Sequence, residues 1–160
     1  MIMHQLDARA RQMIQVLRDL VVRRTAPVEG ITASIRDAED WQTFENGAEW
    51  GWDAAHDWMD FRCTVTVPED YRGKVTLSLA TGREAFALIP NPQFVVWLDG
   101  RIEQAFDTRH TELVLSDTAE PGRSYELFLQ GYANSEYPGR GPRHTTPPRL
   151  KLSVNDVCED

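Results

Sequence analysis

Asp107 and His110 are the residues whose types and spacing best suit chemistry, because they stand three positions apart between two expected strands. A carboxylate accepts a hydrogen bond from an imidazole nitrogen, and at this spacing the pair can fix a tight turn. The same pair can instead point out of the fold, toward a ligand or the active site of a partner protein. The residues alone leave both interpretations open.

Other candidates for catalysis or metal binding are weaker. The four histidines lie far apart, and no two have the spacing of a metal-binding motif. Carboxylates such as Asp57 and Asp60 would have to be held about 5–10 Å apart across a sugar to act as a glycosidase pair, and exposed turns are the commoner use of such residues. Cys63 occupies an inward position of an expected strand, where a free cysteine is a small buried hydrophobe. We predict no metal or cofactor in this chain.

Most of the tryptophans gather in an acidic segment. Residues 31–70 contain two basic and ten acidic groups, and they hold four of the five tryptophans. The indoles can cap a β-core from a solvated loop. Alternatively, Trp50, Trp52 and Trp58 can form a contact surface for a sugar or for a neighbouring domain. Aromatic faces suit sugar C–H groups, and carboxylates accept hydrogen bonds from hydroxyls.

The composition is that of a globular protein with an acidic balance. Lys plus Arg number 17 and Asp plus Glu number 25, so the net charge of the 160 residues is −8. This balance argues against binding to nucleic-acid phosphates, which needs clustered cations. No apolar run reaches the roughly 18 residues of a membrane span, and the first twenty residues lack the apolar stretch of a signal peptide. We predict a soluble, cytoplasmic protein without nucleic-acid or membrane partners.

One amphipathic helix is expected near the start of the chain, over residues 4–24. Its apolar positions recur every three or four residues: Leu6, Ala10, Met13, Ile14, Leu17, Leu20 and Val21. Such a stripe must be covered by its own domain, by a larger protein to which the chain belongs, or by a second copy. We assign residues 1–30 to this helix and a linker, and residues 31–160 to one globular domain.

Beyond Trp58 the apolar period changes from helical to two, which is typical of strands with one buried face. Asp99-Gly100 predicts a type I′ hairpin turn, and residues 133–148 predict a long loop. The expected strands are 61–67, 74–80, 93–98, 101–106, 111–116, 124–131 and 150–154. The sequence therefore predicts a mainly β fold. We expect an antiparallel β-sandwich of the jelly-roll, galactose-binding-domain-like kind, preceded by the helix.

Three stretches in this order resemble a known family. They are Glu49-Trp50-Gly51 with Trp58 to Pro68, then Tyr71-Arg72-Gly73-Lys74-Val75, and then Leu98-Asp99-Gly100 continuing through Gln104, Asp107 and His110 to Glu112. Over residues 45–130 the chain is similar to the N-terminal non-catalytic domain of bacterial and cytosolic-type α-mannosidases of glycoside hydrolase family 38. It departs from the family's pattern where Ala105 replaces a glycine and where Met59 and Asp60 separate Trp58 from Phe61.

The resemblance implies an accessory role. In this family the zinc ion and the nucleophilic aspartate belong to a catalytic domain downstream of the sandwich, and the reaction is retaining hydrolysis of an α-mannoside. This chain is then a separated N-terminal domain, inactive alone, that packs beside the downstream catalytic domain, with Asp107 and His110 facing its entrance.

Two other functions remain open. A stand-alone carbohydrate-binding module would use the same sandwich to bind mannose-containing carbohydrate, with Trp50, Trp52 or Trp58 exposed as a platform. A protein-interaction domain would use the apolar stripe of the N-terminal helix, and an uncovered stripe of this kind favours homo-oligomers.

Overall fold

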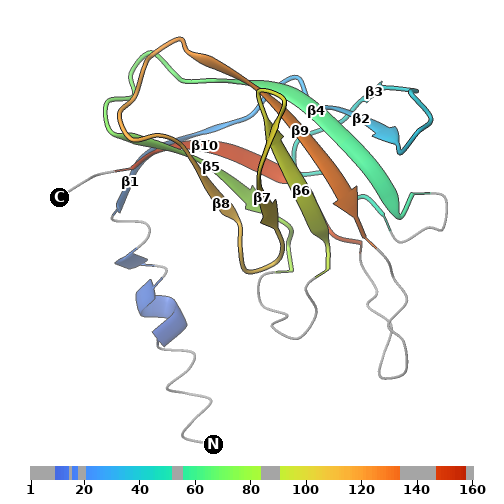
Figure 1. Ribbon diagram of the computed structural model, residues 1–160. Helices are drawn as coiled ribbons and strands as arrows, with labels where there is room; N and C mark the ends of the chain where they lie inside the picture. Colours follow the sequence, from blue (N-terminus) through green and yellow to red (C-terminus); the bar gives the residue numbers. More distant parts are fainter. Residues whose placement is uncertain are drawn as a thin grey trace, which may run out of the picture.

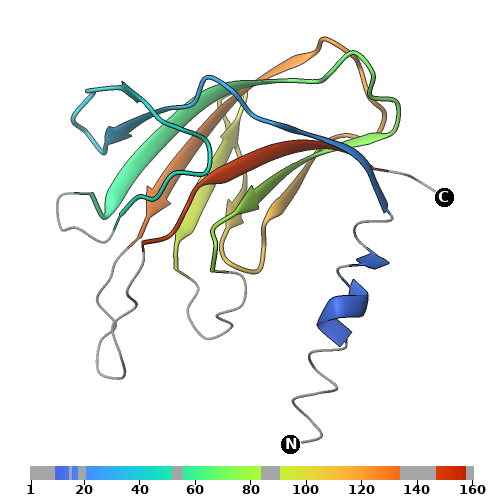
Figure 2. The ribbon, with the colours of Figure 1, turned by 180° about the vertical axis from the view of Figure 1, so that it is seen from behind.

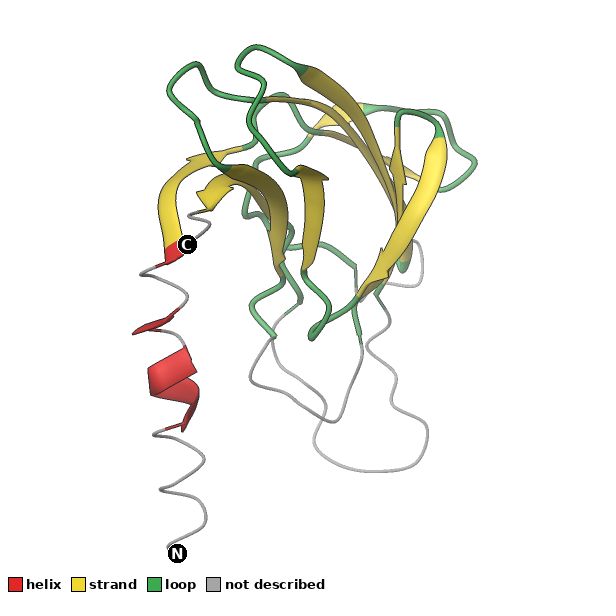
Figure 3. Cartoon of the chain, turned by 60° about the vertical axis from the view of Figure 1, so that its left-hand side comes forward, coloured by secondary structure: helices red, strands yellow, loops and turns green. Residues whose placement is uncertain are grey.

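Two antiparallel sheets form the body of the computed structural model, which describes residues 10–14, 16, 17, 21–51, 56–83, 91–133 and 147–157. A short helical segment at the N-terminus precedes them, and the helical turn of residues 10–14 lies beyond the start of the first strand (Figures 1 and 3). This arrangement confirms the predicted mainly β sandwich with an N-terminal helix.

The smaller sheet has four strands and the larger has six. In spatial order the four-stranded sheet contains β1 (Val22–Pro27), β10 (Lys151–Val157), β5 (Lys74–Ala80) and β8 (Glu112–Ser116). In spatial order the six-stranded sheet contains β3 (Gln42–Thr43), β2 (Thr32–Ile35), β4 (Trp58–Thr66), β9 (Ser124–Tyr132), β6 (Gln93–Leu98) and β7 (Arg101–Phe106). The β6–β7 turn has positive φ angles at both Asp99 (49°) and Gly100 (79°), as the type I′ prediction requires.

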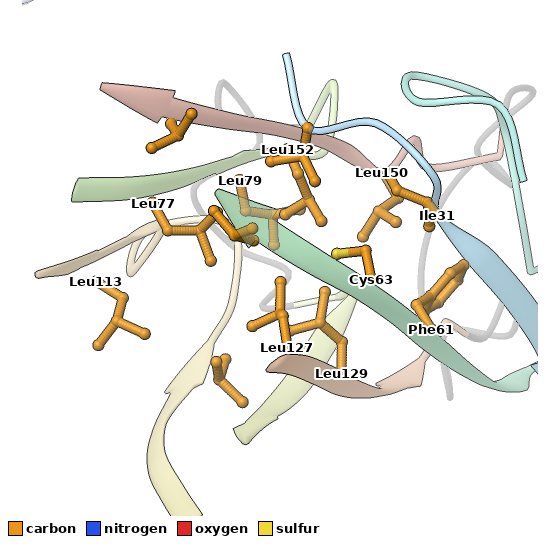
Figure 4. Packing of buried hydrophobic residues seen from close by; sticks show 14 of the residues in the cluster. Ile31, Phe61, Cys63, Leu77, Leu79, Leu113, Leu127, Leu129, Leu150 and Leu152 are labelled. Carbon is orange, nitrogen blue, oxygen red and sulfur yellow. The ribbon is translucent and has the colours of Figure 1, made fainter. Parts of the chain in front are cut away.

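The core lies between the inward faces of the two sheets. Figure 4 shows leucines of β5 and β10 facing Cys63, Leu127 and Leu129 across the sandwich. Alternation along each strand produces this layer, because successive side chains of a strand point to opposite faces. Cys63 is a free, buried cysteine; burial, with a smaller contribution from the charge of Glu126, raises its pKa to about 12. The thiol therefore stays protonated, in keeping with the predicted core role.

The start of the chain differs from the prediction. Residues 22–24 were expected to continue the helix, but β1 begins at Val22 and pairs with β10 along the edge of the smaller sheet (Figure 2). Strands β2 and β3 were not predicted either. β1 contains two arginines and a proline, as edge strands often do, and β2 and β3 are too short to show an alternating pattern. The predicted 133–148 loop falls largely on residues 134–146, which lie outside the described residues.

The turn before β5 is fastened to the end of β10. The buried hydroxyl of Tyr71 donates to the carbonyl of Val154 at 2.7 Å. The carboxylate of Asp156 accepts hydrogen bonds from the amides of Arg72 and Gly73, at 3.1 and 2.7 Å. A side chain at position 73 would overlap the carbonyl oxygen of Val157 and would lie 2.7 Å from Asp156 Oδ1. Glycine is therefore required at position 73 by this close approach of the backbone.

Replacing Gly73 with alanine is expected to lower the free energy of unfolding by about 1–3 kcal/mol, because the added methyl group overpacks a site that cannot withdraw. The Val157 carbonyl is held in register by the pairing of Val157 with Lys74. Urea denaturation measures the change. Tyr71→Phe, which removes one buried hydrogen bond, should cost only about 1 kcal/mol. An alanine variant as stable as the wild type would show that the turn does not need glycine.

Candidate functional site

Trp50 lies in the core and not on the surface. It is only 5% exposed, and its ring lies 5.1 Å from Phe61 and 5.3 Å from Phe94. The ring also lies against the backbone of Gly131, where a Cβ atom would come within 2.8 Å of it. The expectation that Trp50 belongs to an exposed sugar platform is therefore wrong: this indole caps the core, which was the other interpretation of the segment.

Trp58 is on the surface, as a platform residue must be, whereas Trp52 lies outside the described residues. The Trp58 side chain is 50% exposed at the start of β4. Its ring centroid is 4.3 Å from that of Tyr132 on β9, and the guanidinium carbon of Arg36 is 4.7 Å from the Trp58 ring. These contacts restrict the orientation of the indole, while half of the residue's surface stays exposed.

The outward side chains of the six-stranded sheet continue from Trp58 into a larger surface. We call this surface the aromatic face. The register of β4, β9 and β6 creates it, since Trp58 pairs with Tyr132, Arg62 with Phe128, and Phe128 with Trp97 on the next strand. The aromatic face consists of Trp41, Trp58, Arg62, Trp97, Phe128 and Tyr132, with the polar residues Arg36, Asp60 and Gln130 between them.

The polar residues in the middle of the aromatic face are tied to one another. Arg36 donates from Nε and Nη2 to Asp60 Oδ1 at 3.0 Å each, and Asp60 is only 8% exposed. The indole N–H of Trp97 donates to Gln130 Oε1 at 2.9 Å. Asp60 is therefore committed to an ion pair, and its use as one of two glycosidase carboxylates finds no support here.

Arg62 occupies the other end of the aromatic face. Its guanidinium carbon lies 4.0 Å from the centroid of the Trp41 ring and 5.2 Å from that of Phe128. Rings on both sides attract the cation through their negative faces and restrict its orientation. Neither Arg62 nor Trp41 was singled out by the sequence, because the residues of this stack come from three separate segments.

Asp107 and His110 close the connection from β7 to β8. Asp107 Oδ1 accepts hydrogen bonds from the amides of Arg109 and His110, both at 2.7 Å, and the Asp107 amide donates to the His110 carbonyl at 3.0 Å. His110 Nδ1 lies 3.1 Å from both carboxylate oxygens of Asp107. These contacts fit the turn-fixing interpretation of the pair, and its role toward a partner active site stays a prediction.

The same contacts set the ionisation of Asp107. Partial burial on its own would raise the pKa of this carboxyl group, but hydrogen bonds from the His110 and Arg109 amides and from the His110 ring, with the charge of His110, together lower it. The His110 side chain is 75% exposed. With Arg109 it borders a groove between the helical residues Ile14 and Leu17 and the outer face of the four-stranded sheet.

The described part of the chain contains neither a cluster of metal-ligating side chains nor a membrane-spanning helix. No three histidine, cysteine, aspartate or glutamate side chains there are grouped so that they could hold a metal ion. No helix among the same residues is long and apolar enough to span a membrane.

Comparison with known proteins identifies a fold and no family. No protein-family model matches this chain, and no curated protein matches it. Among solved structures, a β-glucuronidase of Ruminococcus gnavus in complex with D-glucuronic acid is similar, with a TM-score of 0.51 at 12% identity over 85% of this chain and 30% of the other. The same enzyme in complex with uronic deoxynojirimycin gives a TM-score of 0.51 at 12% identity, over 85% of this chain and 29% of the other.

These similarities extend over less than a third of the glucuronidase chains. At such low identity they show that the sandwich has the fold of one part of a glycoside hydrolase. They do not extend to family 38 α-mannosidases specifically.

The two described tryptophans of the acidic segment should respond differently to truncation. Trp50→Ala is expected to lower the free energy of unfolding by about 3–5 kcal/mol, because it leaves a cavity in the core. Trp58→Ala should lower it by about 1 kcal/mol or less, since it removes only contacts at the surface. Urea denaturation followed by circular dichroism compares the free energies of unfolding of the two variants. Equal losses would contradict the assignment of Trp50 to the core and Trp58 to the surface.

Asp107→Ala is expected to lower the free energy of unfolding at pH 7 by about 1–3 kcal/mol, through loss of charge-assisted hydrogen bonds. Because the folded pKa of Asp107 is lowered, its contribution is complete above the unfolded pKa of about 3.9 and is lost as the pH falls through the folded value. The difference from wild type should thus be large at pH 7 and shrink in more acidic solution below pH ~4. Asp107→Asn, which keeps a carbonyl acceptor, should cost less; a deficit of Asp107→Ala that stays constant down to pH ~2 would contradict the role of the charge.

Proposed function

We propose that this chain is a non-catalytic accessory β-sandwich domain of a glycoside hydrolase, and that its aromatic face contacts carbohydrate. The shared fold with part of the glucuronidases supports the first half of the proposal. The observation that carries the second half is the exposed Trp58 ring, which is held by Tyr132 and Arg36 yet remains 50% accessible.

The chemistry of the aromatic face suits a sugar. A pyranose ring presents C–H groups on its faces and hydroxyl groups around its rim. The faces pack against aromatic rings, and the hydroxyls exchange hydrogen bonds with amide and guanidinium groups. On this surface Trp58 and Tyr132 supply rings, and Gln130 lies between Asp60 and Val95 in the next row of the sheet. Rings and hydrogen-bonding groups thus alternate over a short distance.

In this proposal hydrolysis is carried out by another domain of a larger enzyme. This chain spans less than a third of the glucuronidases that share its fold, and the proposed role is to hold substrate or to pack beside the catalytic domain. The α-mannosidase assignment is the narrower form of the proposal and rests on the sequence resemblance over residues 45–130.

A second candidate function is protein binding through the N-terminal helical segment. Its apolar side chains are exposed at Met13 (67%), Ile14 (51%), Leu17 (57%) and Val21 (44%). Apolar groups gathered in this way favour burial against a partner. The partner would be the catalytic domain or a second copy of the chain. Sedimentation of the chain across a range of concentrations tests the second copy, because replacing Leu17 with serine should then shift a dimer toward monomer.

Calorimetric titration with a panel of neutral and acidic oligosaccharides, mannobiose included, tests the carbohydrate role. At least one member should bind, and Trp58→Ala should weaken that binding by about tenfold or more, since stacking on an aromatic ring is lost. Val114→Ala is the matched control, because Val114 is an exposed apolar residue (49%) on the other sheet. Absence of binding across the panel, or equal binding by Trp58→Ala, would overturn the proposed contact. Hydrolysis of an aryl α-mannoside by the chain alone would overturn the non-catalytic half.

A further inference from the structure

Arg62 is held in place by two aromatic rings, and its guanidinium donates no hydrogen bond to another described residue. Its guanidinium lies between Trp41, at 4.0 Å, and Phe128, at 5.2 Å, and the residue is exposed on β4. A guanidinium group has five N–H donors at its edge, and stacking on its flat faces consumes none of them. The two rings therefore restrict the position of the guanidinium, and the residue remains exposed to solvent.

Two carboxylates on the same face of the sheet, those of Asp60 and Glu126, have other partners. Residues 31–70 hold only two basic residues, Arg36 and Arg62, among ten acidic ones. Arg36 is paired with Asp60 at 3.0 Å. Glu126, on the neighbouring strand, accepts a hydrogen bond from Thr64 at 3.0 Å. Within the described part of the chain, Arg62 makes no ion pair, although the protein carries a net charge of −8. A cation that is oriented by aromatic rings and has no ion-pair partner among the described residues is suited to bind an external anion.

Arg62 lies at a useful distance from the exposed tryptophan. Trp58 and Arg62 are both outward residues of β4, four positions apart, which corresponds to about 13 Å at the usual strand rise of about 3.3 Å per residue. Between them lie the polar residues Asp60 and Gln130. A short oligosaccharide whose one ring stacks on Trp58 can place a second ring beside Arg62.

We propose that the saccharide bound by the aromatic face carries a carboxylate, as uronic acids do, and that Arg62 binds that carboxylate. This inference rests on the proposed carbohydrate role and gives it a ligand class. Trp58 and Tyr132 stack on one sugar ring, and Arg62 donates two parallel N–H···O bonds to the carboxylate of another. The planar fork of arginine matches a carboxylate in geometry, which the point charge of a lysine does not. Arg62 is therefore the residue that determines specificity for acidic over neutral sugars.

The test is calorimetric titration of the full chain with trisaccharides of galacturonate, mannuronate and glucuronate, each compared with its methyl ester. The ester keeps the sugar and removes the charge. At least one acid should bind about tenfold or more tightly than its ester, because a charge-assisted pair is lost in the ester. Arg62→Gln should abolish this difference. Arg62→Lys should restore only part of it, and added salt should reduce it.

Two further variants make the result specific. Lys151→Gln makes the same change in charge on the four-stranded sheet and should bind like the wild type, since Lys151 is exposed on β10. Trp58→Ala should weaken binding of acid and ester alike. An unchanged circular dichroism spectrum and unfolding midpoint show that Arg62→Gln is folded. Arg62→Lys, which keeps the positive charge, is the second variant in which the role of Arg62 is measured.

Equal affinity for every acid and its ester, or unchanged acid binding by Arg62→Gln, overturns this inference. If neutral sugars still bind in a Trp58-dependent manner, the proposed function survives that result. If no saccharide binds at all, both proposals fail. Binding of the acids that survives Trp58→Ala but not Arg62→Gln would show anion capture without a sugar platform, which also overturns the inference.

Discussion

The pairing of β4 with β9 is the constraint on which the rest of the structure depends. It runs without a break from Trp58 opposite Tyr132 to Thr66 opposite Ser124, in the centre of the larger sheet. Because side chains alternate, this register turns Cys63 and Leu127 into the core and turns Arg62 and Phe128 outward. A slip by one residue would exchange the two faces. The core therefore fixes the register, and the register assembles the aromatic face.

Alternation explains how much of the fold could be predicted. Strands β4 to β10 are predicted within a few residues of their observed bounds, because most of them place apolar side chains at alternate positions and because the Asp99-Gly100 turn predicts the return of the chain in β7. The edge strand β1 could not be found in this way, since its pairing with β10 is decided by tertiary contacts. The helical pattern before it extends through Arg24, three residues into the strand. Short strands at a sheet edge bury few side chains, so their sequences show little of the alternating apolar pattern from which strands are predicted.

The candidate site was predictable only in part, and the tryptophans show why. Composition pointed to the acidic segment but could not separate Trp50, which is 5% exposed, from Trp58, which is 50% exposed. The distinction depends on Gly131, more than seventy positions away, whose missing side chain makes room for the Trp50 ring. The Arg62 stack could not be predicted for the same reason, because Trp41 and Phe128 become neighbours of Arg62 only through the sheet. The signal in the sequence that could have predicted the aromatic face is the set of outward positions on the expected strands.

The sequence motifs that resemble the mannosidase domain have mainly structural tasks in this protein. Asp107 satisfies the amides of a turn, and Gly73 allows β10 to approach the turn before β5. Any sandwich with these turns would favour the same residues, whichever sugar its enzyme cleaves. Such motifs therefore indicate the fold more strongly than the substrate. The fold places far weaker demands on outward positions such as Trp58 and Arg62, since neither side chain fills the core. Ligand specificity should consequently be sought on the aromatic face and not in the motifs that define the sandwich.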